Sequence, residues 1–187
     1  ANNKVVKEMP QVMLDFNAIA QGYTVDVLAS FLEDKGIKNY MVEVGGELRA
    51  KGTKLNESSW TVGIQIPSED EAEAESLFAR VRMNNKSLAT SGNYKKFYVE
   101  EGKKYSHIIN TFTGYPAKNN LLSATVIAND CMTADAYATS FMVMGLEKSK
   151  QFLLENKNLG LEVFFIYDDN GVWKTYATKY FEENREP

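Results

Sequence analysis

The chain has 187 residues, of which 44% are hydrophobic and 25% are charged, and its formal net charge at pH 7 is −4. This composition is typical of globular domains, and the length suits one good-sized domain or two small ones. The acidic balance, without a basic patch, argues against nucleic acid as a partner. The longest apolar runs, such as the one at 161–167, are too short to span a bilayer.

Two residue counts restrict the kinds of site that the chain can build. Cys131 is the only cysteine, which excludes an intrachain disulfide, and His107 is the only histidine, which excludes a multi-histidine metal site. Residues 1–11 are polar and lack the features of a secretory signal. We therefore expect a mature chain or a piece of a longer one.

Hydrophobic periodicity predicts the elements of the first half. In chain order they are a strand at 11–16, a helix from about 18 to 35 that Gly36 ends, and strands at 39–44, 47–53 and 59–67. Gly45 and Gly46 form a tight turn between two of these strands. The acidic run at 68–77 is expected to be a solvated surface segment.

The second half adds more strands before it turns helical. The pattern predicts short strands at 78–83, 86–92, 95–101 and 103–110, a clear strand at 121–128, helices at 131–145 and 147–158, and a hairpin at 161–178. The hairpin turn is the DDNG sequence at 168–171. Together these elements predict a single α+β domain over 1–187, with a largely antiparallel sheet and helices packed on one face.

The helix predicted at 131–145 carries a polar pair on an otherwise apolar surface. Asp135 and Thr139 are four residues apart, so they lie on one helical face. One interpretation places Asp135 in the first turn, where negative charge is favoured. The other places it in the interior, where a carboxylate needs a charged partner or a metal.

Four further polar clusters interrupt the predicted elements, and each also has an ordinary structural explanation. The segment at 14–26 joins a strand end to a helix start and is suited to anions, or is simply a capped helix. The turn at Gly45 and Gly46 allows close approach of a ligand, or is simply a hairpin. Ser91 offers a hydroxyl donor at a turn. His107 precedes several hydroxyl side chains, which suits proton transfer or phosphate contact, although a lone histidine is commonly structural.

Five segments in this order resemble the FAD:protein FMN transferases, the ApbE family once described as thiamine biosynthesis lipoproteins. The segments are DFNAIAQGYTVD at 15–26, GGELRAKG at 45–52, LATSGNY at 88–94, SHIINTFTGYP at 106–116 and MTADAYAT at 132–139. The resemblance runs from about residue 12 to at least residue 145. Each segment alone is modest support, but five in order are highly specific.

The resemblance implies Mg²⁺-dependent transfer of FMN from FAD to a Thr or Ser hydroxyl of a target protein, with release of AMP. The implied metal ligands are the Asp135 carboxylate, the Thr139 hydroxyl and the main-chain carbonyls of Ala18 and Ala138. The implied catalytic residues are His107 and Asp135. The implied flavin-contacting residues are Asp15, Gln21, Gly45, Gly46, Ser91, His107 and Ile109.

The chain departs from the family pattern in three places. Gln21 stands where the family usually has lysine, and Asn110 and Phe112 replace a carboxylate and a proline or arginine. Family chains are also longer, so this chain is expected to be their C-terminal portion, with weak FAD binding and poor transferase activity on its own. The alternatives are a Mg²⁺-dependent FAD pyrophosphatase and a flavin-binding module without catalysis.

The resemblance also implies a cellular setting. We expect an exported protein on the periplasmic side of a bacterial membrane, held by a lipid anchor outside this chain. The expected partners are FAD and an acceptor protein, a subunit of a redox chain.

Overall fold

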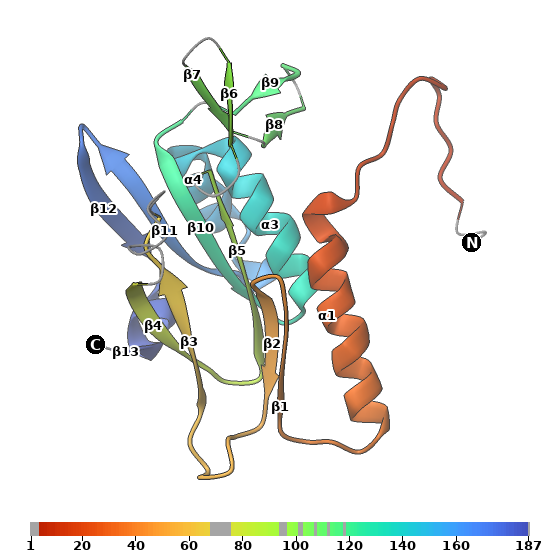
Figure 1. Ribbon diagram of the computed structural model, residues 1–187, viewed down its shortest axis with the longest axis vertical. Helices are drawn as coiled ribbons and strands as arrows, with labels where there is room; N and C mark the ends of the chain where they lie inside the picture. The colour runs from red at the N-terminus through yellow and green to blue at the C-terminus, as the bar shows by residue number, and fades with distance from the viewer. Residues whose placement is uncertain are drawn as a thin grey trace.

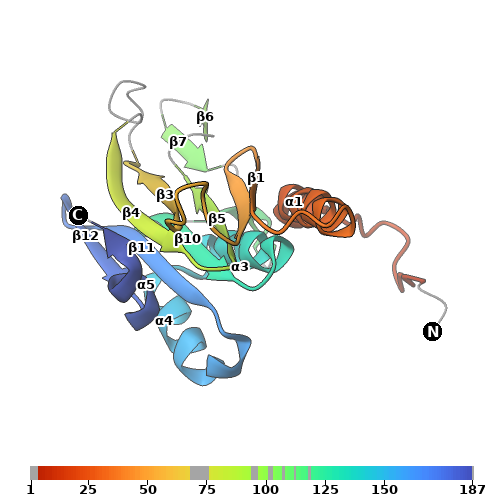
Figure 2. The same ribbon diagram turned by 90° about the horizontal axis from the view of Figure 1, so that it is seen from below.

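A six-stranded antiparallel sheet forms the centre of the molecule (Figures 1 and 2). The computed structural model describes residues 4–67, 76–93, 97–100, 103–106, 108–111, 113–117 and 119–186. The sheet order is β1 (Tyr40–Val44), β2 (Glu47–Lys51), β5 (Lys86–Gly92), β10 (Leu121–Ala128), β11 (Glu162–Asp169) and β12 (Val172–Ala177), and every neighbouring pair is antiparallel.

Smaller sheets surround this centre. One has the order β13 (Arg185–Glu186), β4 (Leu77–Met83) and β3 (Trp60–Gln65). Two short hairpins follow β5 in the chain, β6 (Phe97–Glu100) with β7 (Lys103–Ser106) and β8 (Ile109–Asn110) with β9 (Tyr115–Pro116). The predicted strand at 103–110 is therefore divided between two hairpins, with His107 outside the described residues.

Helices cover one face of the central sheet. They are α1 (Asn17–Asp34), α3 (Cys131–Met144) and α4 (Leu146–Glu155), and a 3-10 turn, η1 (Lys157–Leu159), follows. α3 lies on β5 and β10, and α1 packs on α3 and on β1 and β2 at one side of the sheet. Phe141 of α3 packs edge-on against Phe165 of β11, with ring centroids 5.4 Å apart. Both rings are fully buried, so this helix is fixed to the middle of the sheet.

The opposite face is buried as well. Side chains alternate along β11, so Phe165 points to the helices while Phe164 and Ile166 enter a second core. That core contains Val81 of β4 and Phe181 of α5 (Lys179–Asn184). The α+β class with an antiparallel sheet and a helical face is confirmed, with the small sheet and the short helix α5 as a second layer.

Local sequence explains the main boundaries. The main-chain N–H of Thr133 donates to Asp130 Oδ1 at 2.8 Å, which starts α3, and Gly145 ends it at a positive φ of 76°. The predicted turn at 168–171 is confirmed. Asn170 and Gly171 have φ values of 56° and 86°, and Asn-Gly is the pair that such turns favour.

The prediction of a strand at 11–16 was wrong. No described strand pairs with this segment, and Val12, Met13 and Leu14 are exposed. Its consecutive apolar residues suit a strand, but a strand forms only where a partner completes the hydrogen bonds. The helix α5 was missed because six residues are too few for a periodic signal. Most of the acidic segment at 68–77 lies outside the described residues. Within the described part, no helix has the length and apolar character needed to cross a membrane.

Candidate functional site

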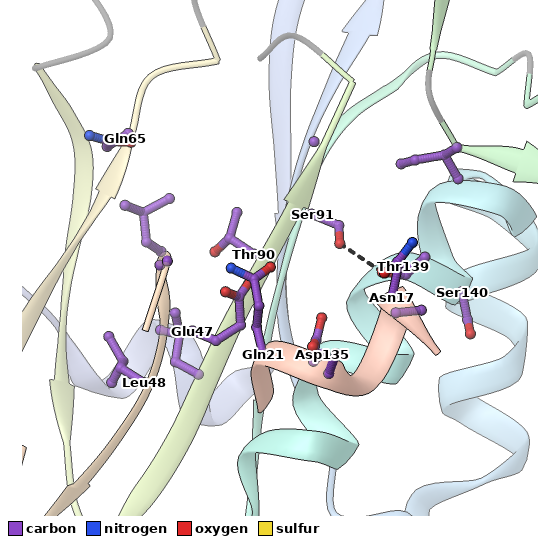
Figure 3. A pocket seen from close by; sticks show the side chains of 18 of the residues that line it. Asn17, Gln21, Glu47, Leu48, Gln65, Thr90, Ser91, Asp135, Thr139 and Ser140 are labelled. Atoms are coloured by element: carbon purple, nitrogen blue, oxygen red, sulfur yellow. Dashed lines mark hydrogen bonds between the residues drawn. The ribbon is translucent and has the colours of Figure 1, made fainter. Parts of the chain in front are cut away.

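A cavity of about 1550 Å³ opens where α1, α3, β5 and the turn between β1 and β2 meet (Figure 3). Nine of the predicted site residues line it: Asp15, Ala18, Gln21, Gly45, Gly46, Ser91, Ile109, Asp135 and Thr139. These residues lie up to 124 positions apart in the sequence, and the fold brings them to one cavity. The prediction did not include Glu47, Thr90 or Ser140, which also line the cavity.

Two predicted residues are not seen at this cavity. Ala138 is fully buried in the core beneath α3 and is not among the lining residues. Its side chain packs in the core between α3 and the sheet, whereas the predicted ligand is its main-chain carbonyl. His107 lies outside the described residues. Its neighbour Ile108 lines the cavity, and so does Thr111.

Asp135 is a buried carboxylate in the body of α3. It is 5% exposed, and the main-chain N–H of Gly22 donates to its Oδ2 at 3.0 Å. Burial raises the pKa of Asp135, and the hydrogen bond from Gly22 opposes that rise. Asp130 occupies the cap position, so the first-turn interpretation of Asp135 was wrong. The interior interpretation, which calls for a compensating partner, is the one that the structure supports.

Thr139 lies one helical turn beyond Asp135 and faces the same cavity. Its Oγ1 is 3.0 Å from Oγ of Ser91 on β5, a hydrogen bond in which either hydroxyl can donate (Figure 3). The contact joins the helix to the sheet at the cavity wall. It also fixes the direction of the Thr139 hydroxyl, because a hydroxyl held by one hydrogen bond has a defined direction for its remaining lone pairs.

Gly22 lets α1 approach α3 closely. A Cβ built on Gly22 would lie 2.4 Å from the carbonyl oxygen of Cys131 and 2.8 Å from Cα of Met132. No side chain fits in that space, so the two helices can pack this closely only with glycine at position 22. The approach is what brings the Gly22 N–H within reach of Asp135.

The turn between β1 and β2 forms another wall. Gly45 has a φ of 68°, and a Cβ built there would lie 2.0 Å from Nε2 of Gln21 and 3.7 Å from Oε2 of Glu47. Gln21 thus lies directly over the glycine, and Glu47, only 7% exposed, lies beside it (Figure 3). The main-chain N–H of Gly46 donates to Glu43 Oε1 at 2.7 Å, which steadies the turn.

Asp15 lines the cavity just before the start of α1. Its Oδ1 accepts the main-chain N–H of Asn17 at 2.7 Å, and its Oδ2 accepts the Asn17 side chain at 3.3 Å. The N-cap residue Phe16 makes no side-chain hydrogen bond to α1, so the Asp15 carboxylate caps this helix end, where negative charge is favoured.

The donor set suits a hard cation rather than a soft one. The described residues contain no group of three or more His, Cys, Asp and Glu side chains that could hold a metal. The cavity instead offers the Asp135 carboxylate, the Thr139 hydroxyl and the main chain at Ala18. Oxygen ligands of these kinds suit Mg²⁺, which needs few protein ligands when substrate phosphates supply others. A cation would also compensate the buried charge of Asp135.

Comparison with known proteins gives a consistent result. A model of the ApbE family matches residues 1–165. A FAD:protein FMN transferase of Vibrio cholerae is 37% identical over 180 residues, which are 96% of this chain and 52% of the relative. One from Haemophilus influenzae is 38% identical over 181 residues, which are 96% of this chain and 51% of the relative.

A solved structure shows the same fold. The flavin transferase ApbE from Vibrio cholerae is 38% identical, with a TM-score of 0.81, over 95% of this chain and 54% of that one. The chain thus spans about half the length of the relatives that it matches. Five ordered sequence segments, the family match and the shared fold agree, and the chain belongs to the ApbE family.

Proposed function

We propose that this chain carries the cation-binding part of a flavin transferase, and that the whole protein moves FMN from FAD to a Thr or Ser hydroxyl of a target protein. The observation that carries the proposal is the buried Asp135 carboxylate, which shares a cavity with the Thr139 hydroxyl. The names of the relatives, FAD:protein FMN transferase, support FAD as the substrate and a protein as the acceptor.

The proposed reaction is a phosphoryl-group transfer. The acceptor hydroxyl oxygen forms a bond to the FMN phosphorus, the bond from that phosphorus to the bridging oxygen breaks, and AMP leaves with that oxygen. A Mg²⁺ ion at this site would neutralise the pyrophosphate charge and favour in-line attack. The proton of the acceptor hydroxyl goes to a base, and we propose His107 for that role. General base catalysis typically raises the reaction rate by about 10²–10⁴-fold.

The residues of this chain position the reacting groups. The Gly22 N–H fixes one oxygen of Asp135 and leaves Oδ1 to a cation. Ser91 orients the Thr139 hydroxyl toward the same space. Gln21, held over Gly45, can donate its amide hydrogens to a phosphate or flavin oxygen. Positioning and charge compensation carry most of the catalysis in this reaction class.

The proposal also covers the acceptor protein and the cellular location of the whole protein. We propose a redox-chain subunit as the acceptor, and an exported protein on the periplasmic side of the membrane with a lipid anchor outside this chain. The support for these statements is the family resemblance alone.

Mass spectrometry of an acceptor protein tests the proposal. The protein is incubated with FAD, Mg²⁺ and an acceptor that carries the target Thr, and with the same acceptor in which Val replaces that Thr. The proposal predicts one covalent FMN on the Thr acceptor and none on the Val acceptor. Free FMN with an unmodified acceptor would indicate a pyrophosphatase, and intact FAD would indicate a binding module.

A further inference from the structure

We propose that Asp26 is a positioning residue of the candidate site. Its carboxylate holds the N-terminus of α3 and thereby sets where Asp135 and Thr139 lie in the cavity. The inference rests on the proposed function, because those two side chains matter only if they face a cation and a phosphate. Asp26 itself is outside the cavity lining.

Asp26 on α1 accepts hydrogen bonds from the first amides of α3. The N–H of Cys131 lies 3.0 Å from Oδ1 and 2.9 Å from Oδ2, and the N–H of Met132 lies 2.9 Å from Oδ2. The first amides of a helix have no acceptor within the helix, and negative charge is favourable beside them. The local cap, Asp130, takes the N–H of Thr133. The first turn of α3 therefore has two caps, one of which comes from another element.

Arg49 on β2 holds the Asp26 carboxylate from the other side. Its Nη1 lies 3.1 Å from Asp26 Oδ1, and its Nη2 lies 3.4 Å from Glu33 Oε1. The Asp26 side chain is 17% exposed, so this pair is largely shielded from solvent. The carboxylate is thus fixed in orientation between the guanidinium and the helix start, and three elements meet at one side chain.

The register of the two helices links Asp26 to the site. Asp26 lies one turn after Gly22 on α1, and Cys131 lies one turn before Asp135 on α3. The contacts 26–131 and 22–135 therefore form two rungs of one helix pair. Thr139 lies one further turn along α3. If the rung at Asp26 is released, α3 can turn or slide at the Gly22 crossing and carry both cavity side chains with it. A shift of about 1 Å at a reacting centre can cost about 10²-fold in rate.

The first test needs no metal and no activity. ¹H–¹⁵N NMR spectra are recorded for the wild type, Asp26→Ala, Asp26→Asn and the matched control Asp34→Asn, which removes an exposed carboxylate from the same helix. The inference predicts that Asp26→Ala shifts the Gly22 amide signal and speeds its hydrogen exchange about fivefold. This factor corresponds to the loss of about 1 kcal/mol that is typical when a helix cap is removed. Asp26→Asn, which keeps one acceptor oxygen, gives a smaller change, and Asp34→Asn gives none.

A second readout uses Mn²⁺, which accepts the same oxygen ligands as Mg²⁺ and broadens nearby NMR signals. In the wild type it should broaden the Gly22 and Thr139 amides, and Asp26→Asn should need a severalfold higher Mn²⁺ concentration. An unchanged Gly22 signal in Asp26→Ala, with a lowered melting temperature, would reduce Asp26 to an ordinary cap and overturn the inference. If Asp26→Ala does not fold, the comparison of Asp26→Asn with Asp34→Asn decides. A wild type without broadening would overturn the proposed cation site, and the metal-free spectra would still decide the role of Asp26.

Discussion

The main-chain N–H of Gly22 on α1 and the carboxylate of Asp135 on α3 form a hydrogen bond of 3.0 Å across 113 positions of sequence. This bond exists because Gly22 has no side chain at the point where the helices touch. A backbone donor serves a buried carboxylate without adding a positive charge, so Asp135 remains able to attract a cation. The close packing of two helices thus decides the chemistry of the cavity.

Gly22→Ala should destabilise the protein although alanine is the better helix former. The added Cβ would meet the Cys131 carbonyl at 2.4 Å, and overpacking of this kind typically costs about 1–3 kcal/mol. Urea denaturation measures the free energy of unfolding. Thr24→Ala is the control, because Thr24 is exposed on the same helix and alanine meets no obstacle there. Equal stability of Gly22→Ala and wild type would show that the helices are farther apart.

The two glycines of the β1–β2 turn offer a matched comparison. Gly45 and Gly46 both have a positive φ, so alanine at either position strains the backbone by about 1 kcal/mol or more. Only at Gly45 does a Cβ collide with Gln21, whereas at Gly46 it meets nothing within 4 Å. Part of the cost of Gly45→Ala should therefore come from displacement of Gln21, whereas the cost of Gly46→Ala, at a φ of 109°, is backbone strain alone.

A double-mutant cycle isolates this collision. Gln21→Ala should relieve part of the loss in Gly45→Ala, with a coupling of about 0.5 kcal/mol because the exposed Gln21 side chain can move aside, and none of the loss in Gly46→Ala. Additive effects at Gly45 and Gln21 would mean that the Gln21 side chain does not lie over the turn.

The pKa of Tyr40 should be about 12, above that of an ordinary tyrosine. It is 5% exposed and donates its hydroxyl hydrogen to Glu33, and burial followed by this hydrogen bond raises its pKa from 10.0 to about 12. Between pH 10 and 12 the folded state keeps a proton that the unfolded state releases. The stability linked to Tyr40 is therefore complete below pH 10 and is lost as pH rises toward 12.

Tyrosinate absorbance against pH measures this directly. Tyr40→Phe should remove an absorbance step near pH 12, and its unfolding free energy should fall less steeply than that of the wild type between pH 10 and 12. The account of this buried hydroxyl is wrong if Tyr40→Phe instead removes a step near pH 10.

The sequence predicted nine of the residues that line the cavity, because its motifs mark backbone features as well as side chains. Asp135 and Thr139 were found from helical spacing, and Gly45 from a double glycine, and all three line one cavity. Spacing of four residues fixes a shared face whatever the helix packs on. The α+β class was predictable for the same reason, since alternation and helical periodicity are local properties.

Contacts between residues far apart in the sequence could not be predicted from local patterns. Asp26 accepts hydrogen bonds from the α3 amides only because of the way the two helices cross. No local pattern in the sequence distinguishes Asp26 from an exposed aspartate on a helix. Glu47 follows the double glycine directly, which was a usable signal for its place in the cavity. The segment 11–16 has a short apolar run but no described partner strand, and a strand depends on that partner.

Calorimetric titration with Mg²⁺ in the presence of FAD tests the central claim most directly, with Asp135→Asn compared with Asp130→Asn. Both variants remove one carboxylate charge, from the body of α3 and from its cap, and asparagine at 130 remains a good cap. Asp135→Asn keeps an acceptor for the Gly22 N–H and removes a charge that burial disfavours, so its free energy of unfolding should not fall. We predict that Asp135→Asn lowers the affinity for Mg²⁺ by at least about tenfold, which is about 1.4 kcal/mol, while Asp130→Asn binds like the wild type. Equal affinity for Mg²⁺ in Asp135→Asn and the wild type would contradict the account.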